Sequence, residues 1–178
     1  MNNKAIIVGI IIKYFPWLYK LLVKSKVKNK SKNPARYYYS VYLRHLIKLN
    51  KNKTNFIPKV VAEIGPGSSL GVGFTALLTG TSKYYGFDVI KHTNVERNIE
   101  IFEEIYELLL NRTPIPDQKE FPSIHPYADS YDFPSEILTD ELLKKTLNKK
   151  RKAEIIKLIK KKIPITLTCS MGRQVKSK

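Results

Sequence analysis

Cysteine and histidine are scarce in this chain of 178 residues, which contains one cysteine and three histidines. The single cysteine, Cys169, excludes an intramolecular disulfide and gives no zinc cluster. His45, His92 and His125 lie in three separate segments, without the short spacing that metal ligands share. We therefore expect no metal site, and a reducing compartment such as the cytoplasm fits the chain.

Acidic residues are absent from the first 58 positions, which carry 13 lysines and arginines. Residues 59–143 carry 14 acidic and 6 basic side chains, and residues 144–178 carry 13 basic side chains against Glu154 alone. The formal charge of +17 therefore resides in two flanks and not in the centre of the chain. Such flanks fit a basic module that binds RNA or an anionic membrane surface.

A membrane-length hydrophobic run is also missing. Residues 5–12 are apolar, but Lys13 and Lys20 interrupt the run and Pro16 would kink a helix. Further apolar residues recur at helical spacing, with lysines between them: Tyr14, Trp17, Leu18, Leu21 and Leu22. We expect a helix that either packs on the following domain or makes peripheral contact with a membrane through residues 5–24, at its inner face. A span or a signal peptide fits less well, because no small-residue cleavage site follows.

Short strands and helices alternate from Lys59 onward. Residues 60–64 are an apolar run typical of a buried parallel strand, and residues 83–89 predict a second strand. Helices are expected at 68–79 and after Thr93, and residues 163–168 offer a third strand. The tight connections favour a parallel α/β sheet. A preceding helix, over residues 34–46, has one apolar stripe: Tyr39, Tyr42, Leu43 and Leu46.

Composition divides the chain into three parts. Residues 1–57 are expected to form a basic N-terminal helical extension, residues 58–168 the α/β domain, and residues 169–178 a basic tail. Within the domain, prolines between 114 and 134 indicate a loop-rich segment, and short helical patterns follow it.

A glycine-rich turn joins the first strand to its helix, with the sequence Glu63-Ile-Gly65-Pro-Gly67-Ser-Ser-Leu-Gly71. Glycine suits a turn whose backbone angles exclude a Cβ atom and a main chain that a ligand approaches closely. In an open α/β sheet this turn lies at the carboxyl edge of the strands, where ligands bind. Asp88 ends the second strand, 25 residues after Glu63, where a carboxylate accepts hydrogen bonds from ribose hydroxyls.

The glycine spacing distinguishes between two nucleotide ligands. A pyrophosphate site uses G-x-G-x-x-G, whereas this turn is spaced G-x-G-x-x-x-G. The Glu63 carboxylate is a poor neighbour for a phosphate and a good one for a cationic amino-acid group. The turn therefore favours S-adenosylmethionine over a nicotinamide dinucleotide.

The segment from Glu63 to Gly67 resembles motif I of class I S-adenosylmethionine-dependent methyltransferases, and Tyr85-Gly-Phe-Asp88 resembles the acidic end of their second strand. More narrowly, residues 63–98 are similar to methyltransferases of bacterial surface-polysaccharide gene clusters. The resemblance implies a Rossmann-like fold and a bound S-adenosyl-L-methionine. It implies cofactor contacts from seven residues: Glu63, Gly65, Pro66, Gly67, Ser68, Asp88 and Asn94.

The resemblance also implies a sugar or polysaccharide precursor as methyl acceptor. The family's fold continues with a strand that ends in an acidic or polar motif, and no such segment follows residue 110. We therefore expect an incomplete sheet of about three strands and a truncated enzyme, with no catalytic residue identified and with retained activity left open.

Overall fold

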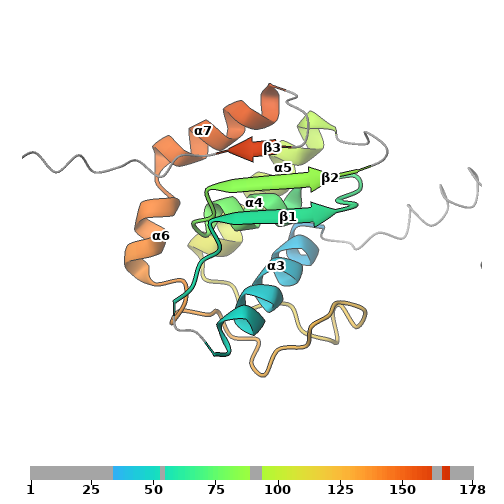
Figure 1. Cartoon of the computed structure of the whole chain (residues 1–178), viewed down its shortest axis with the longest axis vertical. Coiled ribbons are helices and arrows are strands. Elements are labelled where there is room, and N and C mark those ends of the chain that lie inside the picture. The colour runs from blue at the N-terminus through green and yellow to red at the C-terminus, as the bar shows by residue number, and fades with distance from the viewer. Residues whose placement is uncertain (1–33, 53–54, 89–93, 162–165, 169–178) are drawn as a thin grey trace, which may run out of the picture. The chain divides into compact units, whose positions relative to one another are not determined.

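The computed structural model describes residues 34–52, 55–88, 94–161 and 166–168 (Figure 1). Three features discussed above lie outside these ranges, namely the helix proposed within residues 5–24, His92, and the tail with Cys169. From Ala35 onward the chain forms one compact unit. Across the described ranges, no helix has the length and apolar character that a membrane span needs.

Helices and strands alternate in this unit and build a mixed α/β fold. The elements are α3 (Pro34–Asn50), β1 (Val60–Ile64), α4 (Gly71–Leu78), β2 (Lys83–Phe87), α5 (Val95–Leu110), α6 (Asp140–Thr146), α7 (Lys149–Lys160) and β3 (Thr166–Thr168). The predicted elements at 60–64, 68–79, 83–89 and after Thr93 are therefore present, the first with its predicted bounds and the next two slightly shorter.

The sheet has the strand order β1-β2-β3. β1 and β2 are parallel, with Val60 beside Lys83 and Ile64 beside Phe87. β3 is antiparallel to β2, with Thr168 beside Lys83. The expectation of a wholly parallel sheet of about three strands is therefore wrong for its last strand. The physical reason is that α7 runs from α6 toward the carboxyl end of β2, in the same direction as that strand, so β3 begins at the carboxyl edge of the sheet and runs back along β2 (Figure 1).

Side-chain caps fix where three of the helices begin. Asn94 accepts a hydrogen bond from the backbone N–H of Arg97 at the start of α5. Thr139 and Asn148 do the same at the starts of α6 and α7. These side chains bind N–H groups that have no partner within the helix, which sets the register of each helix.

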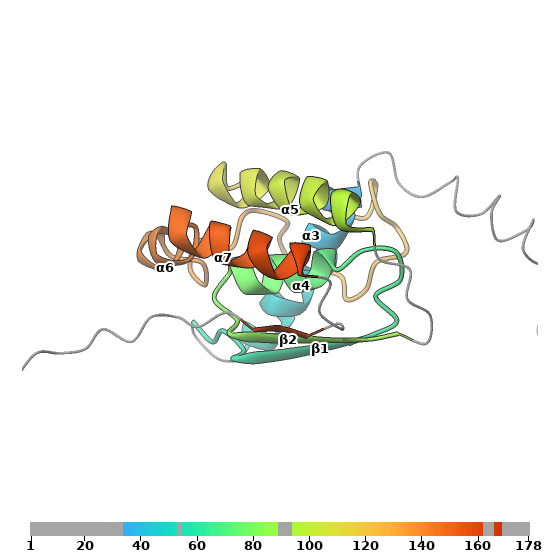
Figure 2. The same ribbon diagram turned by 90° about the horizontal axis from the view of Figure 1, so that it is seen from above.

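The core lies between the sheet and the helices on one of its faces (Figure 2). α4 is buried along its whole length, and Phe74 meets Phe102 of α5 edge to face at 5.8 Å between ring centroids. The predicted stripe of α3 is buried as expected: Tyr39, Tyr42, Leu43 and Leu46. α3 is therefore part of the compact unit, which begins at Ala35 and not at residue 58.

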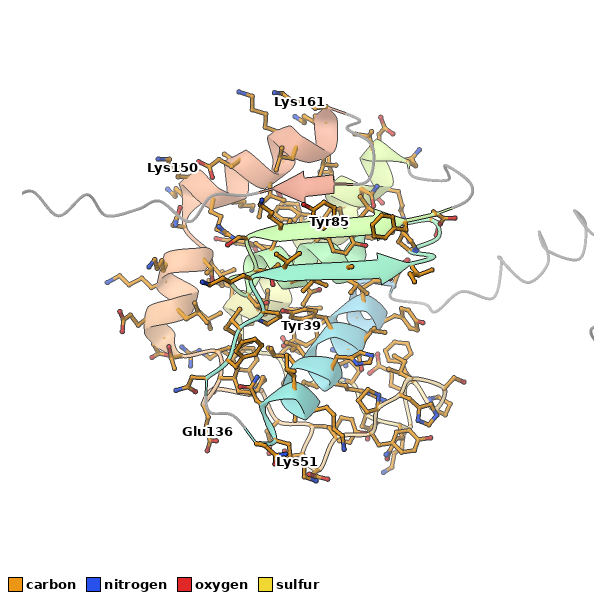
Figure 3. The ribbon with its side chains drawn as sticks, in the orientation of Figure 1. Tyr39, Lys51, Tyr85, Glu136, Lys150 and Lys161 are labelled. Atoms are coloured by element: carbon orange, nitrogen blue, oxygen red, sulfur yellow. The ribbon has the colours of Figure 1, made fainter. Side chains whose placement is uncertain are left out.

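The opposite face of the sheet has no cover from any described element (Figure 2). Ile64 is 90% exposed, Phe87 58% and Val60 52%. Their neighbours on this face include Tyr85, whose ring stacks on Phe87 (Figure 3). Parallel strands are usually buried on both faces, so the exposed apolar side chains distinguish this sheet from most parallel sheets.

Arg44 of α3 is fully buried and anchors the proline-rich segment. Its guanidinium donates to the carbonyl oxygens of Pro116 at 2.6 Å and Ile124 at 2.7 Å, and lies 5.0 Å from the centre of the Tyr131 ring. Ser40 also donates to the Pro116 oxygen, at 2.9 Å. The segment contains no helix or strand, and these contacts attach it to the core.

Arg151 of α7 is buried in the same way. It donates to the Leu77 oxygen at 2.7 Å and to the Thr81 oxygen at 2.8 Å, which binds carbonyls at the C-terminal end of α4 and in the turn to β2. A cation at this end of a helix is favourable. Both arginines come from the basic flanks, so the flanks do not act only as solvated charge.

Candidate functional site

The glycine turn leaves β1 at the carboxyl edge of the parallel pair. Gly65 and Gly67 both have positive φ, 72° and 71°. The Gly65 N–H donates to the Phe87 oxygen at 2.7 Å, which extends the β1–β2 pairing by one residue into the turn. Because other residues rarely adopt positive φ, these two positions require glycine for conformational reasons.

The space around the turn separates its glycines into two kinds. A Cβ atom added at Gly65 or Gly67 would meet nothing within 4 Å. A Cβ atom at Gly71 would lie 2.2 Å from the ring of Tyr38, and one at Gly73 would lie 2.6 Å from the ring of Tyr84. The first two glycines therefore border open space that a ligand can enter, whereas the last two allow close packing of α4.

Asp88 lies beside the turn, as the sequence predicts. Its Oδ2 atom accepts a hydrogen bond from the Gly67 N–H at 3.0 Å. The bond joins the end of β2 to the turn after β1, and it places a carboxylate next to the open space at Gly67. A carboxylate has acceptor capacity beyond one bond, so Asp88 can bind the turn and a ligand hydroxyl together.

Glu63 is the last but one residue of β1 and its side chain is half-buried. The Tyr84 hydroxyl donates to Glu63 Oε2 at 2.5 Å. Burial raises the pKa of the Glu63 carboxyl, and the hydrogen bond from Tyr84 opposes that rise. Burial also raises the pKa of Tyr84, with Glu63 adding to it, so Tyr84 remains a neutral donor.

Ser68 and Pro66 complete the turn. Pro66 is buried and Ser68 is half-buried. Hydrogen bonding with Ser68 lowers the pKa of Tyr38, against the larger rise caused by burial. The turn is thus in contact with α3 through Tyr38, and six of the seven predicted cofactor residues lie in or beside it.

The seventh residue, Asn94, has another role in the structure. It is exposed, and its side chain caps α5. Asn98, one turn later, is buried, and its Oδ1 atom accepts a hydrogen bond from the Leu70 N–H at 3.1 Å. Sequence reasoning missed Asn98, although a polar residue among the apolar positions of a helix was the available signal.

A cavity of about 400 Å³ lies elsewhere, between the end of α3 and residues 127–137. Its lining includes Lys51 and Glu136, labelled in Figure 3, and none of the predicted site residues. Lys51 pairs with Asp129 at its rim, at 3.3 Å. The cavity is therefore separate from the glycine turn.

No protein family model matches the chain, and no curated protein or solved structure matches it.

Proposed function

We propose that this chain binds S-adenosylmethionine at the glycine turn and is the cofactor-binding part of a methyltransferase with a Rossmann-like fold. The observation that carries the proposal is the hydrogen bond between Asp88 and the Gly67 N–H, at 3.0 Å. It brings an acidic strand end and an open glycine turn together at the carboxyl edge of parallel strands, where such folds bind nucleotides.

The residues present fit this cofactor by their chemistry. Asp88 offers carboxylate oxygens to ribose hydroxyls, and Glu63 offers a carboxylate to an ammonium group. The open space at Gly65 and Gly67 allows a ligand to approach the main chain. When bound, S-adenosylmethionine supplies a methyl group on a positively charged sulfur, and the carboxylate of Glu63 disfavours a pyrophosphate in its place.

The acceptor we propose is a sugar or polysaccharide precursor, and this part of the proposal comes from the resemblance alone. The residues described here bind and orient the cofactor. We assign no residue to the acceptor or to the transfer step.

We expect calorimetric titration with S-adenosylmethionine to show saturable binding to the wild-type chain. Asp88→Asn should weaken that binding about 10- to 100-fold, because a hydrogen bond to a charged group contributes about 1.5–3 kcal/mol. The amide keeps an acceptor for the Gly67 N–H, so the substitution removes the charge and preserves the turn. Circular dichroism checks that each variant is folded.

Asp132→Asn is the matched control, because Asp132 is an exposed aspartate bonded to Ser130 in the proline-rich segment. It should bind as the wild type does. A folded wild-type chain that gives no heat with S-adenosylmethionine would contradict the proposal. Binding of NADH in its place would favour the dinucleotide alternative.

A second candidate function is binding to RNA, which the surface of α6 and α7 favours. α7 turns Arg151, Ile155 and Ile159 inward, and Lys150 and Lys161 project away from the sheet (Figure 3). Exposed lysines cover both helices: Lys144, Lys145, Lys149, Lys150, Lys157, Lys160 and Lys161. In this proposal the α/β unit is a scaffold, and the lysines contact phosphates.

The salt dependence of RNA binding tests this candidate. We expect the affinity for a single-stranded oligonucleotide to fall steeply between low and moderate salt, because each phosphate contact releases counterions. Replacing Lys150, Lys157 and Lys161 with glutamine should reduce the slope by about 2, at about 0.7 for each contact. Lys119→Gln, in the proline-rich segment, should leave it unchanged. An affinity that does not depend on salt would exclude this function.

A further inference from the structure

We propose that Tyr84 is a positioning residue that holds the Glu63 carboxylate for a cationic amino group of the ligand, and that Tyr38 attaches the adjoining turn to α3, an inference that rests on the proposed function. The two tyrosines come from different elements, β2 and α3. Their rings pack against two glycines of α4, Gly71 and Gly73, which are separated by one residue. The geometry therefore packs both tyrosine rings on α4, and Tyr84 also reaches the Glu63 carboxylate.

Tyr84 is held firmly. Its side chain is fully buried, and its ring lies so close to Gly73 that an added Cβ atom would be 2.6 Å away. From this fixed position the hydroxyl donates to Glu63 Oε2 at 2.5 Å. One oxygen of the carboxylate is thereby fixed, and an ionised carboxylate has further lone pairs that can accept from an ammonium group.

Tyr38 connects α3 to the turn. Its ring lies against Gly71, where an added Cβ atom would be 2.2 Å away. Burial raises the pKa of Tyr38, hydrogen bonding with Ser68 opposes that rise, and the charge of Glu63 adds to it. Tyr38 thus attaches the turn to α3, while Tyr84 orients the carboxylate itself.

The arrangement has a consequence for pH dependence. An ammonium group binds the charged form of Glu63, so binding is present above the pKa of this carboxyl and is lost as the pH falls through it. Burial raises that pKa and the Tyr84 hydroxyl lowers it. The ionisable groups that face Glu63 within the described residues are Tyr84 of β2 and Tyr38 of α3, and α4 contributes none.

Tyr84→Phe keeps the ring and removes the donor. We expect the acid midpoint of S-adenosylmethionine binding, measured by calorimetry between about pH 5 and 8, to rise by about one pH unit. Tyr85→Phe is the matched control, because Tyr85 is the next residue of β2, points to the uncovered face of the sheet and should leave the midpoint unchanged (Figure 3). Equal weakening at every pH, with no shift of the midpoint, would overturn the inference.

A second measurement separates this inference from the proposed function. The Glu63 carboxyl is titrated by carbon NMR in the unliganded protein, with its signal assigned by its loss in Glu63→Gln. The pKa of Glu63 should be higher in Tyr84→Phe than in the wild type and in Tyr85→Phe. If the wild type does not bind S-adenosylmethionine, the proposed function fails and this comparison still tests the positioning. An unchanged Glu63 pKa in Tyr84→Phe overturns the positioning even where the cofactor binds.

Discussion

Arg44→Ala is expected to lower the free energy of unfolding by about 3 kcal/mol or more. The substitution removes a fully buried side chain and two hydrogen bonds, to Pro116 and Ile124. The Pro116 oxygen keeps Ser40 as a donor, so the Ile124 oxygen is the group left without its partner. An unsatisfied buried carbonyl costs about 1–3 kcal/mol, and the cavity adds a further penalty. Urea denaturation followed by circular dichroism measures the change.

Arg36→Ala provides the comparison, because Arg36 lies two turns earlier on α3 and contacts the same segment. It forms a two-bond ion pair with Glu120, at 2.8 and 2.7 Å, in which both side chains are partly exposed. Exposed pairs contribute about 0–1 kcal/mol, so this variant should stay near wild-type stability. The stability of Arg44→Lys should be intermediate, because an ammonium group lacks the planar guanidinium that donates to two carbonyls at once. Equal effects of Arg36→Ala and Arg44→Ala would contradict the structural account.

Gly73→Ala is expected to lower the free energy of unfolding by up to about 2 kcal/mol. Alanine normally stabilises a helix relative to glycine by about 1 kcal/mol, so the expected change is opposite in sign to helix propensity. The reason is steric, because the added Cβ atom would lie 2.6 Å from the Tyr84 ring. Overfilling a packed core usually costs about 1–3 kcal/mol. Denaturant titration of the single variant tests the sign.

A double-mutant cycle tests the cause. In Tyr84→Ala, which removes the ring, adding Gly73→Ala should cost far less than it does in the wild type. Additive effects of the two substitutions would show that the Tyr84 ring is not what Gly73 accommodates. A stabilising effect of Gly73→Ala alone would contradict the close packing of α4 on β2.

The elements that sequence predicts well are those whose signals are local. β1 matches its predicted bounds because an apolar run and two glycines define it, and α5 follows from a long helical pattern with Asn94 as its cap. The inward face of α5 is harder to predict from the sequence. Ile101 and Ile105 are buried, whereas Ile99 and Tyr106, at other apolar positions of the helix, are only partly buried. Two adjacent apolar stripes fit this sequence equally well, and only contact with α4 and α7 decides between them.

Features that depend on distant contacts were not predictable in this way. The direction of β3 depends on the direction in which α7 crosses the sheet. The burial of Arg44 and Arg151 depends on carbonyl groups about 70 to 80 residues away along the chain, so both arginines look like ordinary surface charge in the sequence. Because composition gives no sign of these contacts, both arginines are assigned to the basic flanks on sequence alone.

The site shows the same division. The positive φ values of Gly65 and Gly67 and the position of Asp88 follow from the motif and its spacing. The hydrogen bond from Tyr84 depends on the register of β1 and β2, which pairs Glu63 with Gly86. In this register the hydroxyl of Tyr84, two residues before Gly86, reaches the Glu63 carboxylate. A single sequence does not contain that register.

The contact between Arg44 and the proline-rich segment also determines when α3 can complete its packing during synthesis. Arg44 and the Ile124 carbonyl are 80 residues apart in the chain. A ribosome adding about 5–20 residues per second needs roughly 4–16 s to travel that distance. During this interval α3 lacks the acceptors for its guanidinium, and the charge remains in water. The helix therefore completes its packing only after Ile124 has been synthesised.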